Sequence, residues 1–327
     1  MKAFVLESGN LEIKNIEEPV LNDDQVLVNI RTAGLNRRDV GIPNRVGRKT
    51  ETLVLGSDGA GVIEEVGAHV TNFSIGDEVI INPSLGWFEN SDVPPQNFDI
   101  LGMPSDGTFA EKIAISADQV EIKPAHLSWD EAGVIALAAV TGYRALFTKG
   151  ELKEGETVFI PGAGSGVATY LIMFAKSVGA KVIVTSRSPE KRAKASELGA
   201  DIVLDTASDW PEKLAGETVD LVVDSVGKAT FNRSLEVLKK GGRIVVFGAT
   251  TEDTVDFNLR AFFYGQYQLL GTTMGSREEL REALALIDTN NFHPIVDKSF
   301  ELNHAKEAFY YLKEGKQFGK VSIKISD

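Results

Sequence analysis

The hydrophobic pattern of the chain changes partway along its length. Apolar and polar residues alternate in 11–16 and 26–30, and a period of two predicts strands with one buried face. Glycines bound further short apolar runs at 55–67, 76–82 and 107–115. Several short strands at this spacing predict a β-rich first unit, such as a partly open barrel.

From about residue 125 the pattern becomes helical and then alternates between two periods. Residues 130–147 read as a helix, and from 157 short apolar runs alternate with amphipathic segments. The apolar runs predict strands within 157–162, 181–187, 201–205, 219–227, 242–248 and 268–273. Strands that alternate with helices predict a doubly wound parallel sheet, so the fold class is α/β.

The end of the chain returns to a different pattern. A helix over 276–290 begins with the capping box Ser276 and Glu279. A second helix follows, and 321–325 is a closing strand that has no partner in the second unit by pattern alone. We therefore expect residues 1–124, completed by 272–327, to form one domain and 125–271 to form the other.

Composition narrows the class of protein. A length of 327 residues allows two domains, and a formal charge of −13 argues against nucleic-acid or anionic-membrane binding. There is no cysteine, which excludes disulfides, thiolate nucleophiles and Cys-ligated zinc. None of the four histidines lies within four residues of another, and no apolar run approaches the roughly 18 residues of a membrane span. The opening residues lack a signal-peptide core, so a soluble cytoplasmic enzyme is expected.

A glycine-rich turn after the first strand of the second domain predicts a dinucleotide site. Glycines allow a tight turn and a close approach of the pyrophosphate, and the N-terminus of the following helix favours a phosphate. The spacing is irregular, because a valine stands where the third glycine of G-x-G-x-x-G is usual. The alternative is an ordinary tight turn. The expected contacts are Gly162, Gly164, Ser165, Gly166 and Val167.

The end of the strand predicted within 181–187 indicates whether NADH or NADPH binds. An NAD site normally has an acidic residue there, for the ribose 2′-hydroxyl. This chain has Ser186 and Arg187, followed by Lys191. A hydroxyl and two cations suit a 2′-phosphate, so we expect NADPH rather than NADH. The alternative is that Arg187 and Lys191 are solvated surface charges.

Further motifs accompany the glycine turn, at residues 33–39, 56–67, 76–79, 107–111, 141–143, 223–227, 241–243 and 318–321. Together they resemble the medium-chain dehydrogenase/reductase superfamily, in its zinc-independent, quinone oxidoreductase-like branch. The resemblance covers nearly the whole chain and implies a GroES-like catalytic domain with a Rossmann domain inserted into it.

The chain departs from the zinc enzymes of this superfamily. Where those enzymes hold zinc, the resemblance places Asn36, Ser57 and Leu137, and the four-cysteine structural lobe has no counterpart. Asn and Ser are poor zinc ligands and Leu is none. We therefore expect no metal.

The resemblance also implies roles for individual residues. It places Asn36 beside the nicotinamide and acceptor, Arg37 at the pyrophosphate, Arg38 as a neighbouring positive charge, Asp58 as the holder of a positive group or a water, and Thr141 at the nicotinamide pocket. Each residue also has a local alternative role. Asn36 would tie a turn, and the two arginines would form ion pairs with Asp39 or the acidic surface. Asp58 would make structural hydrogen bonds, and Thr141 would bond to the backbone of its own helix. Further cofactor contacts are expected at Ser225, Val226, Gly227, Phe247, Gly248, Ala249, Thr272, Met274 and Lys320. On the long loop 84–105, Trp87 and Phe88 are candidates to stack on a flat substrate.

These residues predict an NADPH-dependent, zinc-independent reductase of quinones or small α,β-unsaturated carbonyls. Without a Lewis acid, alcohol oxidation is hard, whereas electron-poor acceptors take a hydride without a metal. The alternatives are a reductase of an enoyl thioester or aldehyde, a non-catalytic NADPH-binding sensor, and a zinc alcohol dehydrogenase. The stretch 40–54 holds no tyrosine, which weakens the enoyl-thioester alternative because some such enzymes place their acid there. The resemblance also implies a homodimer, formed through the edge strand at 268–274, whose exposed backbone can pair with the same strand of a second copy.

Overall fold

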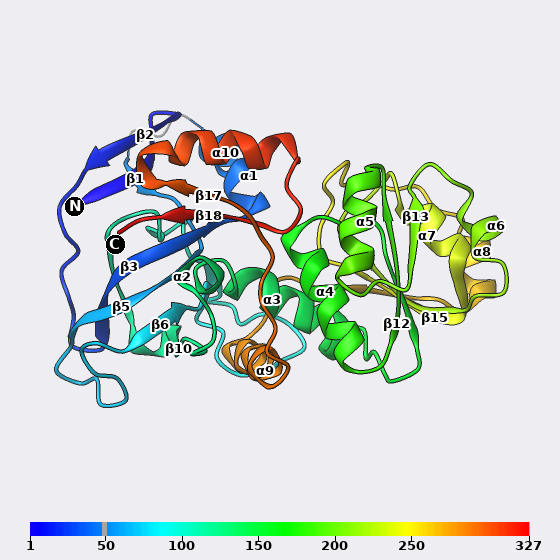
Figure 1. Ribbon diagram of the computed structural model, residues 1–327, viewed down its shortest axis with the longest axis horizontal. Coiled ribbons are helices and arrows are strands. Elements are labelled where there is room, and N and C mark those ends of the chain that lie inside the picture. The colour runs from blue at the N-terminus through cyan, green and yellow to red at the C-terminus, as the bar shows by residue number, and fades with distance from the viewer. Residues whose placement is uncertain (48–50, 327) are drawn as a thin grey trace. The chain divides into compact units, whose positions relative to one another are not determined.

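The computed structural model describes residues 1–47 and 51–326, and it divides the chain into two compact units. Unit 1 is Met1–Ala139 with Gly275–Asp327, and unit 2 is Val140–Met274. This division differs from the predicted boundaries, because residues 125–139 pack with unit 1. At Gly133, for example, a Cβ atom would lie 2.6 Å from the carbonyl oxygen of Thr32. In Figure 1, unit 1 has the blue and red ends of the chain and unit 2 the green and yellow middle.

Unit 1 is built mainly of strands. Its strands are β1 (Lys2–Glu7), β2 (Asn10–Asn15), β3 (Gln25–Leu35), β4 (Leu53–Val54), β5 (Asp58–Val66), β6 (Glu78–Ile81), β7 (Ser84–Leu85), β8 (Asp99–Ile100), β9 (Lys112–Ser116), β10 (Val120–Ile122), β17 (Val296–Glu301) and β18 (Lys320–Lys324). Its helices are α1 (Arg37–Val46), α2 (Trp129–Ala132), α9 (Arg277–Thr289) and α10 (Ala305–Glu314), with 3₁₀ turns η1 (Ala117–Gln119) and η3 (Leu302–His304).

The main sheet of unit 1 combines strands that come before and after unit 2 in the chain. Its order is β10-β6-β5-β3-β18-β17, with β9 also paired to β3. The closing strand β18 pairs antiparallel with β3 and parallel with β17, so the C-terminal segment completes this sheet. Inward-facing apolar side chains form the core, including Phe4, Ile30 and Phe109.

Unit 2 is a parallel sheet with helices between its strands, as predicted. Its strands are β11 (Thr157–Ile160), β12 (Lys181–Ser186), β13 (Ile202–Asp205), β14 (Val219–Asp224), β15 (Leu238–Val246) and β16 (Gln268–Gly271). Its helices are α4 (Gly166–Ser177), α5 (Pro189–Glu197), α6 (Trp210–Lys213), α7 (Phe231–Val237) and α8 (Leu259–Gly265), with a π-helical turn η2 (Arg144–Lys149). The sheet order is β13-β12-β11-β14-β15-β16, which confirms the predicted doubly wound class.

The predicted helix over 130–147 is interrupted. It appears as α2, then α3 (Ala136–Tyr143), which runs across the division between the units, and then η2. Gly133 ends the first piece, where the backbone lies against Thr32 of β3. The predicted capping box of α9 is confirmed, because the Glu279 carboxylate accepts from the Ser276 backbone N–H at 2.8 Å.

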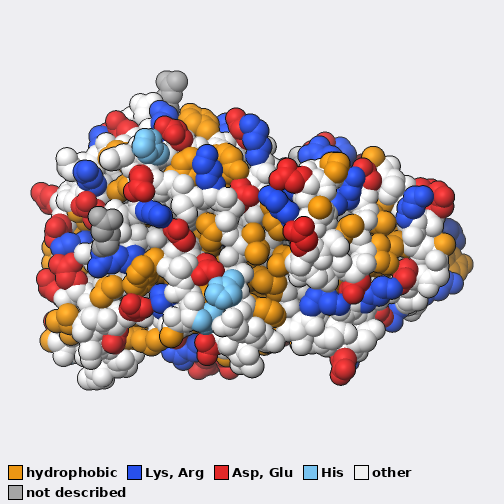
Figure 2. All heavy atoms as spheres, viewed as in Figure 1, with side chains coloured by type: hydrophobic (Ala, Val, Ile, Leu, Met, Phe, Trp, Pro, Cys, Tyr) orange, Lys and Arg blue, Asp and Glu red, His pale blue; other side chains and the backbone are white. Residues whose placement is uncertain are grey.

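The surface mixes both signs of charge. Figure 2 shows acidic and basic side chains interleaved over the face in view. None of the described helices combines the length and hydropathy that spanning a bilayer requires.

Candidate active site

The glycine-rich turn of unit 2 leads from β11 into α4. Gly162 and Gly164 have φ values of +82° and +116°, which favour glycine. Ser165 caps α4, and its Oγ accepts from the Ala168 N–H at 3.0 Å. The N–H groups of Gly166 and Val167 lie in the first helical turn, where the helix itself has no acceptors. This turn therefore has the geometry that binds a pyrophosphate.

A buried carboxylate that sequence reasoning did not single out organises the turn after β14. Asp224 accepts from the Val226 N–H at 2.7 Å, the Gly227 N–H at 3.1 Å and the Thr230 hydroxyl at 2.7 Å. Burial raises the pKa of the Asp224 carboxyl. The signal that would have identified it is an acidic residue directly after the apolar run 221–223. The carboxylate therefore fixes the turn that carries Ser225, Val226 and Gly227.

The predicted turns after β14, β15 and β16 lie side by side. The Phe247 N–H donates to the Asp224 carbonyl at 3.1 Å, and the Thr272 N–H donates to the Val246 carbonyl at 3.0 Å. Within the described part of the chain, the buried Thr272 Oγ1 has no hydrogen-bond partner. Met274 is buried with a φ of +45°. The segment 247–249 thus shares the carboxyl edge of the sheet with its neighbours, which is where open α/β sheets bind ligands.

At the end of β12 the predicted cationic region is present, with one further member. Ser186 is buried, and its Oγ accepts from the Ser188 N–H at 3.2 Å, whereas Arg187 is exposed. Lys191 lies in the first turn of α5. That member is Arg192, which the sequence pattern did not indicate; its Nη1 donates to the Ser186 carbonyl at 2.6 Å and to Asp205 Oδ2 at 3.0 Å. Asp205 at the end of β13 is thus neutralised by Arg192.

Unit 1 brings together three polar side chains from distant parts of the chain, Asn36, Asp58 and Lys320, which we call the lysine cluster. Lys320 Nζ donates to Asp58 Oδ2 at 2.9 Å and to Asn36 Oδ1 at 2.5 Å. Asn36 Nδ2 donates to the same Asp58 oxygen at 3.0 Å. The other Asp58 oxygen accepts from the Leu137 N–H at 2.7 Å. The cluster is a closed, buried ion pair with every carboxylate oxygen in use.

Strand register explains why these residues meet. Gly34 pairs with Asp58 across β3 and β5, and Leu35 pairs with Val321 across β3 and β18. Asn36 follows β3, Asp58 begins β5 and Lys320 begins β18, so one place in the sheet collects all three. A Cβ atom at Gly34 would lie 2.7 Å from the Gly133 carbonyl oxygen. The sheet therefore needs a glycine beside the cluster.

A second charged group lies next to the lysine cluster. Arg38 donates to Ser57 Oγ at 2.6 Å and to the Leu101 carbonyl at 2.7 Å. Asp39 is fully buried and accepts from the Asn36 N–H at 2.8 Å. Burial raises the pKa of the Asp39 carboxyl to about 6, even though Arg38, 3.9 Å away, acts in the opposite direction. Arg38 thus anchors the loop at 101 and partners Asp39.

Three other predicted site residues have local roles in the structure or lie elsewhere. Arg37 is exposed and donates to the carbonyls of residues 312 and 313 at 3.2 and 3.3 Å, at the C-terminal end of α10, where a cation is favourable. Trp87 is fully buried, with its ring 5.3 Å from that of Phe98. Its enclosure argues against stacking on a substrate. Thr141 is buried in α3, on the unit 2 side of the division.

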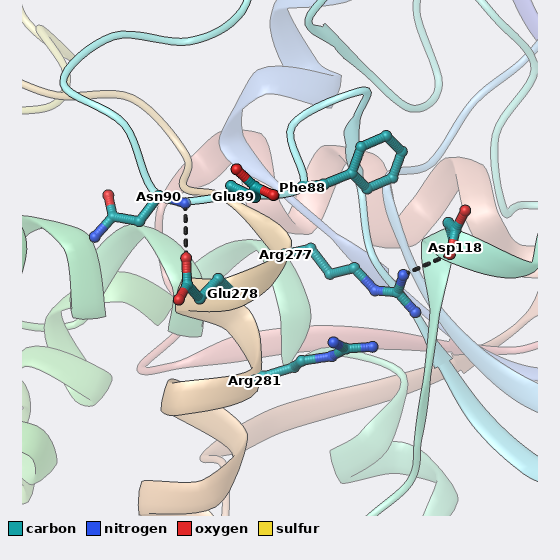
Figure 3. Close-up of a pocket in the computed structure, with 7 residues that line it drawn as sticks. All are labelled: Phe88, Glu89, Asn90, Asp118, Arg277, Glu278 and Arg281. Atoms are coloured by element: carbon teal, nitrogen blue, oxygen red, sulfur yellow. Dashed lines mark hydrogen bonds and ion pairs between the residues drawn. The ribbon is translucent and has the colours of Figure 1, made fainter.

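Exposed Phe88 lines a surface pocket on unit 1 (Figure 3). Arg277 and Arg281 project into it from α9. Arg277 pairs with Asp118 at 2.8 Å and with Glu121, and Arg281 also pairs with Glu121 at 2.9 Å. The first N–H groups of α9 donate to the carbonyls of residues 87 and 88 at 2.8 and 3.0 Å. The arginines of this pocket are therefore held in ion pairs, and backbone hydrogen bonds attach the long loop to the start of α9.

The site does not suit a zinc ion. The three positions matched to zinc ligands offer an amide, a hydroxyl and an aliphatic side chain, and the Lys320 ammonium already binds Asn36 and Asp58. The fold does bring together two histidines that sequence spacing separates, since the rings of His126 and His293 lie 5.3 Å apart. The described residues nonetheless contain no group of three or more metal-binding side chains.

Comparisons with known proteins agree with this architecture. Residues 22–125 match the alcohol dehydrogenase GroES-like domain, and residues 166–289 match the zinc-binding dehydrogenase family. A zinc-type alcohol dehydrogenase-like protein of Leptosphaeria maculans is 32% identical, over 96% of this chain and 94% of that protein. An acryloyl-coenzyme A reductase of Sulfurisphaera tokodaii is 29% identical, over 99% of this chain and all of that one.

Solved structures give the same result. An NAD-dependent alcohol dehydrogenase superposes with a TM-score of 0.94 at 33% identity, over the full length of both chains. A 2-octenoyl-CoA carboxylase reductase in complex with NADP and 2-octenoyl-CoA superposes with a TM-score of 0.87 at 25% identity, over 99% of this chain and 87% of that one. The chain belongs to the medium-chain dehydrogenase/reductase superfamily of oxidoreductases.

Proposed function

We propose that the chain is an NADPH-dependent reductase that transfers a hydride to a conjugated carbonyl or a quinone without a metal. The observation that carries the proposal is the lysine cluster, because the Lys320 ammonium binds Asn36, which the sequence resemblance matches to a zinc ligand, and Asp58, which follows another such position. Such a site has no Lewis acid to ionise an alcohol. It suits acceptors that need only hydrogen-bond donors at a developing oxyanion.

Unit 2 supports the choice of cofactor. The positive-φ glycines, the first turn of α4 and the turn held by Asp224 fit a dinucleotide pyrophosphate. When bound, NADPH supplies the hydride. Exposed Arg187 and the neighbouring Lys191 suit its 2′-phosphate. One structural neighbour is named as NAD-dependent and another was solved with NADP, so the cationic residues are what favour NADPH here.

The substrate class has a second candidate, an enoyl thioester. The acryloyl-coenzyme A reductase and the structure with 2-octenoyl-CoA favour it. An enoyl thioester is itself a conjugated carbonyl, so its reduction also requires hydrogen-bond donors at the carbonyl oxygen. The absence of tyrosine from 40–54 argues that any proton comes from another source; the structure describes this stretch apart from 48–50.

One assay separates these possibilities. Loss of NADPH, and in parallel of NADH, is followed after chelator treatment with quinones, small enones, enoyl-CoA thioesters and aldehydes. We expect turnover of at least one conjugated acceptor or quinone, with NADPH favoured at least tenfold, which is about 1.4 kcal/mol. Loss of activity on chelation would contradict the metal-free mechanism. Tight NADPH binding without turnover of any acceptor would instead indicate a sensor.

We also propose that the chain forms a homodimer through unit 2. Strand β16 lies at the edge of its sheet, and Leu269 on it is 45% exposed. Leu259, Phe263 and Tyr264 of the neighbouring α8 are also exposed. Unpaired edges with apolar neighbours invite pairing. Light scattering should show a dimer that Leu269→Lys shifts towards monomer, whereas a monomeric wild type would refute this arrangement.

A further inference from the structure

The lysine cluster places a cation where the metal-binding positions of zinc relatives converge. Asn36 binds Lys320 directly, Ser57 immediately precedes Asp58, and the Leu137 N–H holds the second oxygen of Asp58. All three matched positions thus surround or adjoin one ammonium group. A metal-dependent relative uses the charge of its ion at a substrate oxygen, and an ammonium group supplies a positive charge with N–H donors but no Lewis acid.

Lys320 has the properties that such a role needs. An ammonium carries three N–H donors, and two acceptors, on Asp58 and Asn36, are described for them. Lys320 is 4% exposed and Asn36 6%, whereas Asp58 has no exposed surface. The carboxylate is the most enclosed member of the cluster and pairs with the ammonium, because a buried cation without a partner is strongly disfavoured.

We propose that the Lys320 ammonium binds the carbonyl oxygen of the acceptor and stabilises the negative charge that develops on it, with Asp58 and Asn36 as positioning residues. The inference rests on the proposed function and names the catalytic residue for it. It assigns to Lys320 a role at the substrate in place of the contact to the cofactor that the sequence resemblance implied.

In the proposed reaction, negative charge develops on the carbonyl oxygen that Lys320 binds. The hydride adds to the β-carbon of the conjugated carbonyl, and the C=C electron pair moves onto the carbonyl oxygen as an enolate. The third N–H of Lys320 donates to that oxygen while the charge is there. Water then gives a proton to the α-carbon, and the products are the saturated carbonyl and the oxidised nicotinamide. Lys320 keeps its own proton throughout.

The test removes the charge without leaving an unpaired ion. The double variant Lys320→Met with Asp58→Asn eliminates both charges of the pair at similar side-chain volume, so it avoids the buried, uncompensated carboxylate that Lys320→Met alone would leave. Lys324→Met is the matched control, because Lys324 lies on the same strand and is exposed. Circular dichroism and thermal unfolding establish that each variant is folded.

Steady-state kinetics with the best acceptor of the wild type give the first readout. We expect kcat of the double variant to fall by about 100- to 1,000-fold, the size of effect seen when one oxyanion donor is removed. The Kd for NADPH should stay within about twofold, and Lys324→Met should match the wild type. A raised Kd for NADPH with unchanged kcat would overturn the proposal and return Lys320 to a role in cofactor binding.

A second readout needs no turnover. 4-Nitrophenol absorbs differently as the phenol and as the phenolate, and a cation at the oxygen favours the phenolate. In the presence of NADP⁺, the wild type and Lys324→Met should raise the phenolate fraction near neutral pH, and the double variant should not. Equal phenolate fractions in all three proteins would overturn the proposal.

The outcomes distinguish this inference from the proposed function. If the wild type reduces an acceptor but a folded double variant retains its kcat, the role of Lys320 is wrong and the reductase function stands. If the wild type turns over no conjugated carbonyl or quinone, the proposed function is wrong and the role of Lys320 falls with it.

Discussion

The candidate sites of the two units present charge differently. In unit 2, Arg187 is an exposed cation after β12, and the first N–H groups of α4 have no acceptors within the helix. In unit 1, Lys320 pairs with Asp58 in a buried position and Arg38 lies beside buried Asp39. The first arrangement suits a large anion that arrives with its own charge. The second suits a neutral substrate on which charge appears only during the reaction.

The largest effect should come from opening the buried pair. Asp58→Ala leaves the Lys320 ammonium buried with Asn36 alone, and breaking one partner of a buried pair costs about 3–5 kcal/mol. We therefore expect urea unfolding to show a loss of this size. Exposed Asp23→Ala is the control and should be nearly neutral. A loss below about 1 kcal/mol for Asp58→Ala would mean that water screens the cluster as it screens an exposed ion pair.

Asp39 should make the stability of the protein depend on pH. Its pKa is about 6 in the folded protein, above its ordinary value of 3.8, so between these values the folded state binds more protons than the unfolded chain. The protonated Asp39 carboxyl therefore makes its full contribution to the free energy of unfolding below about pH 4. This contribution is lost as the pH rises to about 6, a change of about 3 kcal/mol.

Denaturant unfolding of the wild type and Asp39→Asn across this range would isolate that component. The difference between the two proteins should change by up to about 3 kcal/mol between pH 4 and 6. Asp23→Asn, at an exposed position, serves as the control. Parallel curves for wild type and Asp39→Asn would refute the buried, proton-binding state of Asp39.

In unit 2 the expected effect is on binding rather than on stability. Arg187→Ala removes one charge-assisted contact to the 2′-phosphate, worth about 1.5–3 kcal/mol, so the Kd for NADPH should rise by about 10- to 100-fold. The Kd for NADH should not change, because NADH lacks that phosphate. Fluorescence titration measures both, with exposed Lys213→Ala as control. Equal weakening for the two dinucleotides would refute the phosphate contact.

The smallest effect is expected from removing a helix cap, and one cap from each unit can be compared. Ser165 caps α4 in unit 2 and Ser276 caps α9 in unit 1. Replacing either with alanine should cost about 1 kcal/mol of stability. Only Ser165→Ala should also weaken NADPH binding, since it loosens the turn that we assign to the pyrophosphate. An equal effect of Ser276→Ala on NADPH binding would contradict the assignment.

Unit 2 was largely predictable because its site is local in sequence. The glycine turn, the end of β12 and the turns at the carboxyl edge each lie within a few residues of a strand that hydrophobic pattern identifies. The contacts in unit 2 that were not predicted depend on the direction in which a side chain points. Arg192 comes one residue after Lys191 yet bridges Ser186 and Asp205, which the sequence does not indicate.

Unit 1 was less predictable because its contacts are long-range. Asn36 and Asp58 were identified from the resemblance, but their contact with Lys320 depends on the register of β18 against β3. The enclosure of Trp87 and the contact of Arg37 with α10 likewise depend on tertiary packing. The pattern predicted the strands, and only their pairing determines which polar side chains share a site.

The sheet order of unit 1 also sets the time at which its chemistry can arise during synthesis. Because β3 must wait for β18, with all of unit 2 lying between them in the chain, Asn36 and Asp58 are made long before the lysine that neutralises them. A chain whose synthesis stops between unit 2 and β18 would contain all of unit 2 but an unfinished sheet in unit 1, in which the Asp58 carboxylate lacks its lysine partner. We expect such incomplete chains to be degraded, because their unpaired strand edges and unfolded segments are accessible to proteases.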